Sequence, residues 1–287
     1  MRTLVGSGLV VLALAISGAR AEPIKIVAAE RVYGGIAEQI GGTNVAVISI
    51  LIHPNQDPHE FEANAATARA IADARLVIYN GAGYDPWAMK LLSASKSPSR
   101  EVIEVVRLVH KKAGANPHVW YETAAISALA ETLAAKLKQL DPAHAFDYAG
   151  RLAAFESSMG PLRQRIATLR AKYAGTPVTA TEPVFDYMAD ALGLTMRNGR
   201  FQLAVMNGTE PSAAAIAAFE TDLRTHAAKV LLYNTQTGQA LAEHMRTLAS
   251  QAGVPVVAIT ETAPAGKSYQ EWMASQLDGL DRALGGR

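Results

Sequence analysis

Short runs of apolar and β-branched residues alternate with longer amphipathic stretches along most of this chain. The short runs have the length of buried strands, and the amphipathic stretches have the spacing of helices that cover a sheet. We expect strands at Pro23–Ala29, Val45–Leu51, Leu76–Tyr79, Val102–Val106, Pro177–Thr181, Lys229–Tyr233 and Pro255–Thr260. Such alternation of strands and helices is typical of parallel sheets in α/β proteins.

A long helical pattern occupies the middle of the chain. One helix should end at Asp141-Pro142, and a second pattern follows from Ala143 to Tyr173. Gly160-Pro161 lies within that second pattern, and proline removes a backbone donor, so we expect a kink or a break there. The residues after Tyr173 repeat the strand–helix order of the first half.

The order of these elements predicts an α/β protein with two lobes, each a mostly parallel sheet flanked by helices. We expect an N-terminal lobe over residues 22–142, a linking helix over 143–174 and a C-terminal lobe over 175–287. One rigid connection should limit rotation of the lobes, so a cleft between them would close by small motions.

Residues 1–21 have the features of a cleaved signal peptide. Arg2 is followed by an apolar run over Leu4–Ile16, and Ala19-Arg20-Ala21 forms an A-x-A cleavage site before Glu22. The run is too short for an ordinary membrane span. We therefore expect a mature protein in the periplasm of a Gram-negative bacterium.

The composition limits which metal ligands and which kinds of binding partner the chain can have. The chain has no cysteine, so we expect neither a disulfide nor a lipid anchor, and any metal site must use His, Asp or Glu. With 27 basic and 26 acidic residues, the net charge is only +1. This balance does not indicate binding to nucleic acid or to an anionic membrane.

Four strand ends carry a candidate metal ligand. They are His59, in the proline-stiffened loop 53–62, His118, in the similar loop 116–121, Glu182 and Glu261. Ligands bind at the strand ends of open α/β sheets, so two residues from each lobe would meet at the cleft. Two imidazoles and two carboxylates suit zinc, manganese or ferrous iron.

Each candidate also has a purely structural interpretation. The loop with His59 could be a polar turn in which His53 is the competing histidine, and His118 could cap the following helix. Glu182 could face a helix N-terminus, where a carboxylate is favoured in any case. We interpret aromatic residues such as Tyr84 and Trp120 as packing of the core or of the lobe junction, although Trp120 could line the cleft.

The motifs resemble the substrate-binding proteins of zinc/manganese-type ABC importers. The similar segments are Val27–Ile40, Val45–Ala65 with Asp57-Pro58-His59-Glu60-Phe61-Glu62, Leu76–Trp87, Asn116-Pro117-His118-Val119-Trp120 and Glu210-Pro211-Ser212. They extend over essentially the whole mature chain. The resemblance implies a receptor that binds a divalent metal as cargo and delivers it to an inner-membrane ABC permease.

The resemblance also implies the ligand set. His59 and His118 match the first two ligands, and Glu182 matches a position that is often Glu in manganese proteins and usually His in zinc proteins. Glu261 stands where the family usually has Asp, so its side chain is one methylene longer. The family's acidic motif after the penultimate strand reads Tyr233-Asn234-Thr235-Gln236-Thr237, and the histidine-rich loop of many zinc members is absent.

We therefore expect a monomeric periplasmic receptor that performs no chemistry on its zinc or manganese cargo, with Fe²⁺ as a further candidate. Two alternatives remain. Two histidines and a carboxylate could activate water in a zinc hydrolase, although no H-E-x-x-H motif is present. The chain could also be a receptor for an organic ligand in which the histidines are incidental.

Overall fold

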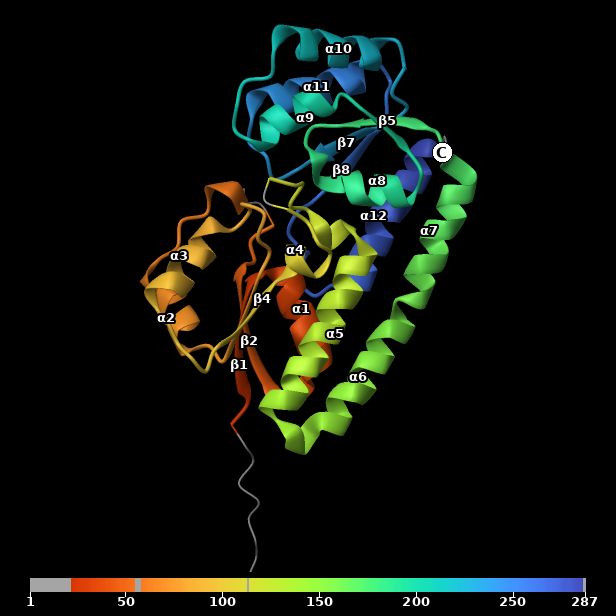
Figure 1. The fold of residues 1–287 in the computed structure, drawn as a ribbon. Coiled ribbons are helices and arrows are strands. Elements are labelled where there is room, and N and C mark those ends of the chain that lie inside the picture. Colours follow the sequence, from red (N-terminus) through yellow and green to blue (C-terminus); the bar gives the residue numbers. More distant parts are fainter. Residues whose placement is uncertain (1–21, 55–57, 113, 286–287) are drawn as a thin grey trace, which may run out of the picture.

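The computed structural model describes residues 22–54, 58–112 and 114–285, and it contains two parallel four-stranded sheets (Figure 1). The first sheet has the order β2-β1-β3-β4 and the second the order β6-β5-β7-β8. The strands are β1 Ile24–Glu30, β2 Val45–Leu51, β3 Leu76–Tyr79, β4 Glu101–Glu104, β5 Pro177–Ala180, β6 Thr195–Arg197, β7 Leu231–Asn234 and β8 Val256–Ile259. The predicted α/β fold with two lobes is confirmed.

Helices cover both sheets, as expected for parallel strands that are buried on both faces. The first lobe contains α1 Arg31–Gly41, α2 Ala65–Asp73, α3 Pro86–Ala94, α4 Val105–Leu108 and α5 Thr123–Leu140. The second lobe contains α8 Asp186–Ala191, α9 Gly199–Met206, α10 Ala213–Arg224, α11 Ala240–Gln251 and α12 Tyr269–Leu284. Short 3-10 turns flank the site described below, namely η2 Pro58–Glu60, η3 Val119–Tyr121 and η5 Pro183–Phe185.

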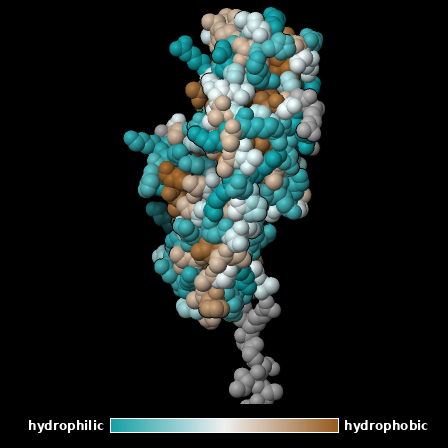
Figure 2. Space-filling view, turned by 90° about the vertical axis from the view of Figure 1, so that its right-hand side faces the viewer, coloured by the Kyte–Doolittle hydropathy of each residue, from teal (hydrophilic) through white to brown (hydrophobic). Residues whose placement is uncertain are grey.

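Two consecutive helices connect the lobes along one side of the molecule (Figure 1). α6 Ala145–Ser158 and α7 Gly160–Tyr173 meet at Met159, and Pro161 lies in the first turn of α7. The predicted break at Gly160-Pro161 is therefore confirmed. Hydrophilic side chains predominate on the face of the molecule that carries this connection (Figure 2).

The apolar core continues from one lobe into the other. A single cluster of buried side chains joins the first sheet, α5, the connection and the inner part of the second lobe. At the junction, the ring of Tyr121 lies 5.2 Å from that of Phe185 and 5.7 Å from that of Trp272. A shared apolar junction resists wide opening, which fits the expectation of small closing motions.

The structure differs from the sequence-based assignment in two places. The strand predicted at Val102–Val106 is wrong in its second part, because β4 ends at Glu104 and α4 begins at Val105. The pair β6 and α9 was not predicted. Both elements are short, which makes them hard to recognise from sequence. β6 has only three residues, and α9 begins directly after a left-handed Asn198.

Two glycines of the first helix, Gly35 near its middle and Gly41 at its end, provide a matched test of packing. An added Cβ at Gly41 would lie 2.3 and 2.4 Å from the two methyl carbons of Val45 and 2.9 Å from its Cβ, whereas one at Gly35 would meet nothing within 4 Å. Gly41→Ala should therefore destabilise the fold by about 1–3 kcal/mol. Gly35→Ala should stabilise it by up to about 1 kcal/mol, because alanine favours the helix. Denaturant unfolding tests both, and equal effects would contradict this packing.

Acid should weaken the contact between α7 and α12. Hydrogen bonds from Tyr173 and Lys172, opposed by burial, lower the pKa of Asp281 from 3.8 to about 2. A lowered pKa means that the ionised group stabilises the fold above about pH 4 and loses this effect as the pH falls towards 2. The difference in unfolding free energy between the native chain and Asp281→Asn should shrink over that window and with added salt. Asp73→Asn, at an exposed position in α2 outside this contact, is the control, and a constant difference for Asp281→Asn would contradict the interpretation.

Candidate metal centre

His59 lies at the opening of the site. It follows β2 by way of the turn η2, and its side chain is 27% exposed. Its ring packs edge-on against that of Tyr84 at 5.1 Å. On its outer side, Pro58, Phe61, Trp87 and Lys90 help to line a pocket that also contains His59. The histidine can therefore be reached from solvent while its inner face points at the other lobe.

His118 lies deeper, directly before the turn η3, and its side chain is fully buried. The Asn116 Oδ1 atom accepts from the His118 backbone N–H at 3.0 Å and lies 2.7 Å from Nδ1. Because a side-chain amide oxygen can only accept, this contact places a ring proton on Nδ1, and in the neutral imidazole the lone pair is then on Nε2. Buried Nε2 has no hydrogen-bond partner among the described residues.

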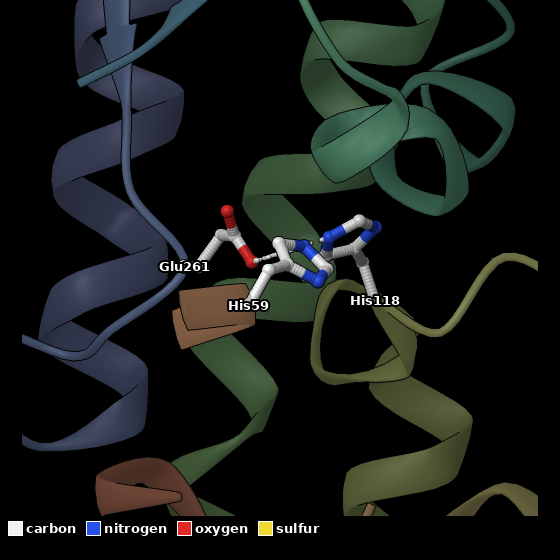
Figure 3. Close-up of side chains that lie close together, drawn as sticks. All are labelled: His59, His118 and Glu261. Atoms are coloured by element: carbon white, nitrogen blue, oxygen red, sulfur yellow. Dashed lines mark ion pairs between the residues drawn. The ribbon is translucent and has the colours of Figure 1, made fainter. Parts of the chain in front are cut away.

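Glu261 comes from the other lobe, in the loop after β8, and its side chain is 1% exposed. Its Oε2 atom lies 3.3 Å from His118 Nε2 and 3.7 Å from His59 Nε2. The same oxygen accepts from the Tyr84 hydroxyl at 2.8 Å. Figure 3 shows this oxygen directed at the two imidazoles and the other oxygen directed away.

The surroundings favour the ionised form of this glutamate. Burial alone would raise the pKa of Glu261, but His118, His59 and the Tyr84 hydroxyl outweigh burial and lower it. The carboxylate therefore offers a full negative charge beside two nitrogen donors. Buried charge is stable only where it is paired, and a cation between these groups would pair it.

The spacing of the three ligand atoms suits a metal ion. Atoms from His59, His118 and Glu261 all lie within 4.8 Å of one another. Two ligands of a tetrahedral zinc ion stand ~3.4 Å apart when each bond is ~2.1 Å long. The measured separations of 3.3 and 3.7 Å are close to this value. A cation would also satisfy the unpartnered His118 Nε2.

Glu182 is buried at the end of β5, near this group but outside it. Its Oε2 accepts from Asn234 Nδ2 at 2.5 Å, and the same nitrogen donates to Glu261 Oε1 at 2.7 Å. The structure thus links the two predicted carboxylates through an amide, and a ligand role for Glu182 stays a prediction. His53 is exposed and is not part of the group.

The loop that carries Glu261 is fixed on both sides. Gln236 Oε1 accepts from the backbone N–H groups of Glu261 and Thr262 at 2.7 and 2.8 Å. The Thr260 carbonyl accepts from the Tyr121 hydroxyl of the other lobe at 2.8 Å. These bonds hold the carboxylate in place before any ligand binds.

Sequence reasoning missed the residues that support the ligands. Tyr84 was interpreted as packing, but its hydroxyl binds Glu261. Asn116 and Asn234 had no assigned role, although each makes short side-chain hydrogen bonds at the site. The only sequence feature that pointed to Asn116 was its position in the same loop as His118. The only feature that pointed to Asn234 was that its segment replaces an acidic motif of the family.

Comparison with known families gives a match over nearly the whole chain. The sequence model of the family described as zinc-uptake complex component A, periplasmic, matches residues 26–283. This span includes both sheets and all four predicted ligands.

Two relatives show the range of named cargo. A manganese ABC transporter substrate-binding lipoprotein of Streptococcus mitis is 23% identical over 290 residues, covering 93% of this chain and 91% of the relative. A zinc-binding lipoprotein of Streptococcus pneumoniae is 24% identical over 272 residues, covering 85% of this chain and 52% of the relative. The chain thus spans about half the length of the second protein.

Solved structures share the fold. The periplasmic zinc binding protein TroA of Treponema pallidum superposes with a TM-score of 0.76 at 18% identity, covering 92% of this chain and 99% of that one. The substrate-binding protein FpvC of Pseudomonas aeruginosa, in complex with Mn²⁺, superposes with a TM-score of 0.75 at 24% identity, again covering 92% and 99%.

Asn116 makes two contacts that can be tested separately. One is the hydrogen bond to the His118 ring, and the other is the hydrogen bond to the Pro183 carbonyl of the other lobe. Asn116→Ala should weaken binding of Zn²⁺ or Mn²⁺ by about 10–100-fold, because the orientation of a metal-binding imidazole depends on its second hydrogen bond. Asn116→Asp keeps the acceptor for Nδ1 but loses the donor to the Pro183 carbonyl, and it should bind at least as tightly as the native chain. Metal titration of metal-free protein measures the affinity of both variants. If both variants lost the same affinity, the loss would come from the broken contact with Pro183 and not from the His118 hydrogen bond.

Proposed function

Because the chain belongs to the family of the periplasmic zinc-uptake component A, we propose that it binds a divalent transition metal ion and delivers it to an ABC importer. One observation carries the proposal at the level of atoms. His59 and His118 of one lobe face Glu261 of the other lobe, with ligand atoms within 4.8 Å. The metal is the cargo, and it would be held where the lobes meet.

The ligand set is proposed as His59, His118, Glu261 and Glu182. The first three already lie together, and Glu182 is connected to Glu261 through Asn234. Imidazole and carboxylate donors suit zinc and manganese, the ions named for the relatives. Fe²⁺ is a further candidate for the same donors.

Substrate binding accounts for the site better than catalysis does. Members of this family are substrate-binding proteins, and the rings of Tyr84 and Trp120 pack against the buried donor His118. A zinc hydrolase would need one coordination position kept for water. A ligand set of four protein residues would fill a tetrahedral ion, so we propose that the chain performs no chemistry on the metal.

The partner and compartment follow from the same proposal. A receptor of an ABC importer acts with a membrane permease, and we propose that this one does so as a monomer in the periplasm. Among the described residues, no helix has the length and apolarity needed to cross a membrane. The signal peptide predicted for residues 1–21 lies outside the described residues. We retain 22–142, 143–174 and 175–287 as the proposed division into lobe, linking helix and lobe.

Histidine variants test the function directly. His59→Ala and His118→Ala should each weaken Zn²⁺ and Mn²⁺ binding by more than about a hundredfold, a larger loss than that expected for a supporting residue. His244→Ala is the matched control, because His244 is exposed and binds Glu220 far from the metal centre. Calorimetric titration of metal-free protein measures affinity, and circular dichroism verifies folding. Unchanged affinity in the first two variants would refute the assignment.

A further inference from the structure

The side chain of Asn234 lies between the two predicted carboxylate ligands. We infer that Asn234 restricts each carboxylate to one metal-binding oxygen and so favours a four-coordinate cargo, which means zinc over manganese. This inference rests on the proposed function and identifies the ion class that the same site selects. Asn234 is a positioning residue here, because its amide holds the carboxylates of Glu182 and Glu261 and is not itself offered as a metal ligand.

The orientation of the amide is determined by its neighbours. Asn234 ends β7 and is 2% exposed. Its Oδ1 accepts from the Gln236 backbone N–H at 3.1 Å, so the NH₂ group must be the part that faces the two carboxylates. Its own backbone N–H donates to Thr181 Oγ1 at 3.0 Å. With both ends bound, the side chain cannot rotate without losing several buried hydrogen bonds.

The amide engages one oxygen of each carboxylate. Nδ2 lies 2.5 Å from Glu182 Oε2 and 2.7 Å from Glu261 Oε1. The other oxygen of Glu261, Oε2, is the one that faces both histidines. Because Oε1 faces the amide and is directed away from the imidazoles (Figure 3), binding a metal through both oxygens would require the Glu261 carboxylate to turn and would strain this buried hydrogen bond, which is costly. Single-oxygen binding keeps every one of these bonds.

Coordination number then depends on the amide. Two imidazoles and two carboxylates provide four ligand atoms when each carboxylate uses one oxygen, and six when each uses both. Zinc in protein sites is commonly four-coordinate and tetrahedral, whereas manganese favours octahedral, oxygen-rich sites. The family resemblance of Glu182 alone pointed to manganese. The amide at Asn234 points the other way, because it withholds the additional oxygens that manganese would use.

The test combines affinity with a direct readout of geometry. Asn234→Ala removes the donor, and Asn234→Leu removes it while keeping a side chain of similar size and adding no charge. Because zinc binds most nitrogen and oxygen sites more tightly than manganese, the informative quantity is the change in the ratio of the two affinities. We expect Asn234→Ala to raise Mn²⁺ affinity relative to Zn²⁺ by about tenfold or more. Co²⁺ bound to the native protein should show the intense visible bands of a tetrahedral ion, and the variant should show the weak bands of higher coordination.

A control variant separates this effect from a general loss of packing. Asn198 bridges Thr179 and Asp222 in the same lobe, away from the carboxylates, and has a left-handed backbone that glycine tolerates. Asn198→Gly should change neither the Co²⁺ spectrum nor the affinity ratio. Circular dichroism verifies that each variant is folded, and Asn234→Leu is the second variant to test if the alanine variant is not.

The outcomes distinguish this inference from the proposed function. A native Co²⁺ spectrum of the six-coordinate type, or an unchanged spectrum and ratio in folded Asn234 variants, would overturn the role of the amide. The proposed function would survive either of these outcomes, provided that the native protein still binds metal and that His59→Ala still loses metal affinity. If the native protein binds none of the three ions, or if His59→Ala binds as well as native, the proposed function itself fails.

Discussion

A negative charge buried between two lobes is the constraint on which the site depends. Glu261 is almost fully enclosed, its surroundings lower the pKa of its carboxyl group, and an isolated carboxylate there would be unstable. Tyr84 and Asn234 donate to it, and two imidazoles face it. These contacts compensate only part of the charge. Under the proposed function, a divalent cation would complete the compensation and would at the same time connect the two lobes.

The folding pattern explains why these groups meet. Parallel strands all end at the same edge of their sheet, so loops after different strands gather there. His59 follows β2, and Glu261 follows β8 in the opposite lobe. The broken helix α6–α7 and the apolar junction then keep the two edges face to face. Neither lobe alone contains a complete set of donors.

The sequence was sufficient for features that depend on local patterns. Most strands, the break at Gly160-Pro161 and the position of His118 beside a stiff loop follow from periodicity and proline chemistry. Residues 105–108 form a helix, although β-branched residues such as Val105 and Val106 favour strands. For so short a run, tertiary contacts decide between helix and strand. Of the predicted ligands, His59, His118 and Glu261 meet in the structure and Glu182 lies outside that group, and the ligand roles of all four remain proposals.

The supporting residues could not be found in the same way. Tyr84 and Glu261 are 177 positions apart, and Asn234 joins residues 52 and 27 positions away. Contacts between residues so far apart leave no signal in the local hydrophobic periodicity of the sequence. An asparagine or a tyrosine in a loop has the same appearance in sequence whether it faces solvent or a buried carboxylate. Only the arrangement of the two lobes distinguishes these cases.

Asn116 gives the metal centre a mechanical link to the lobe junction. Its side chain binds the His118 ring on one side and the Pro183 carbonyl of the second lobe on the other, while its own carbonyl accepts from Tyr187. Any force that separates the lobes at this point therefore also pulls on the segment that orients a metal-facing imidazole. By reciprocity, a protein that binds the separated form must lower metal affinity by the same factor by which metal lowers its own binding. Under the proposed function, one residue would then couple metal binding to separation of the lobes.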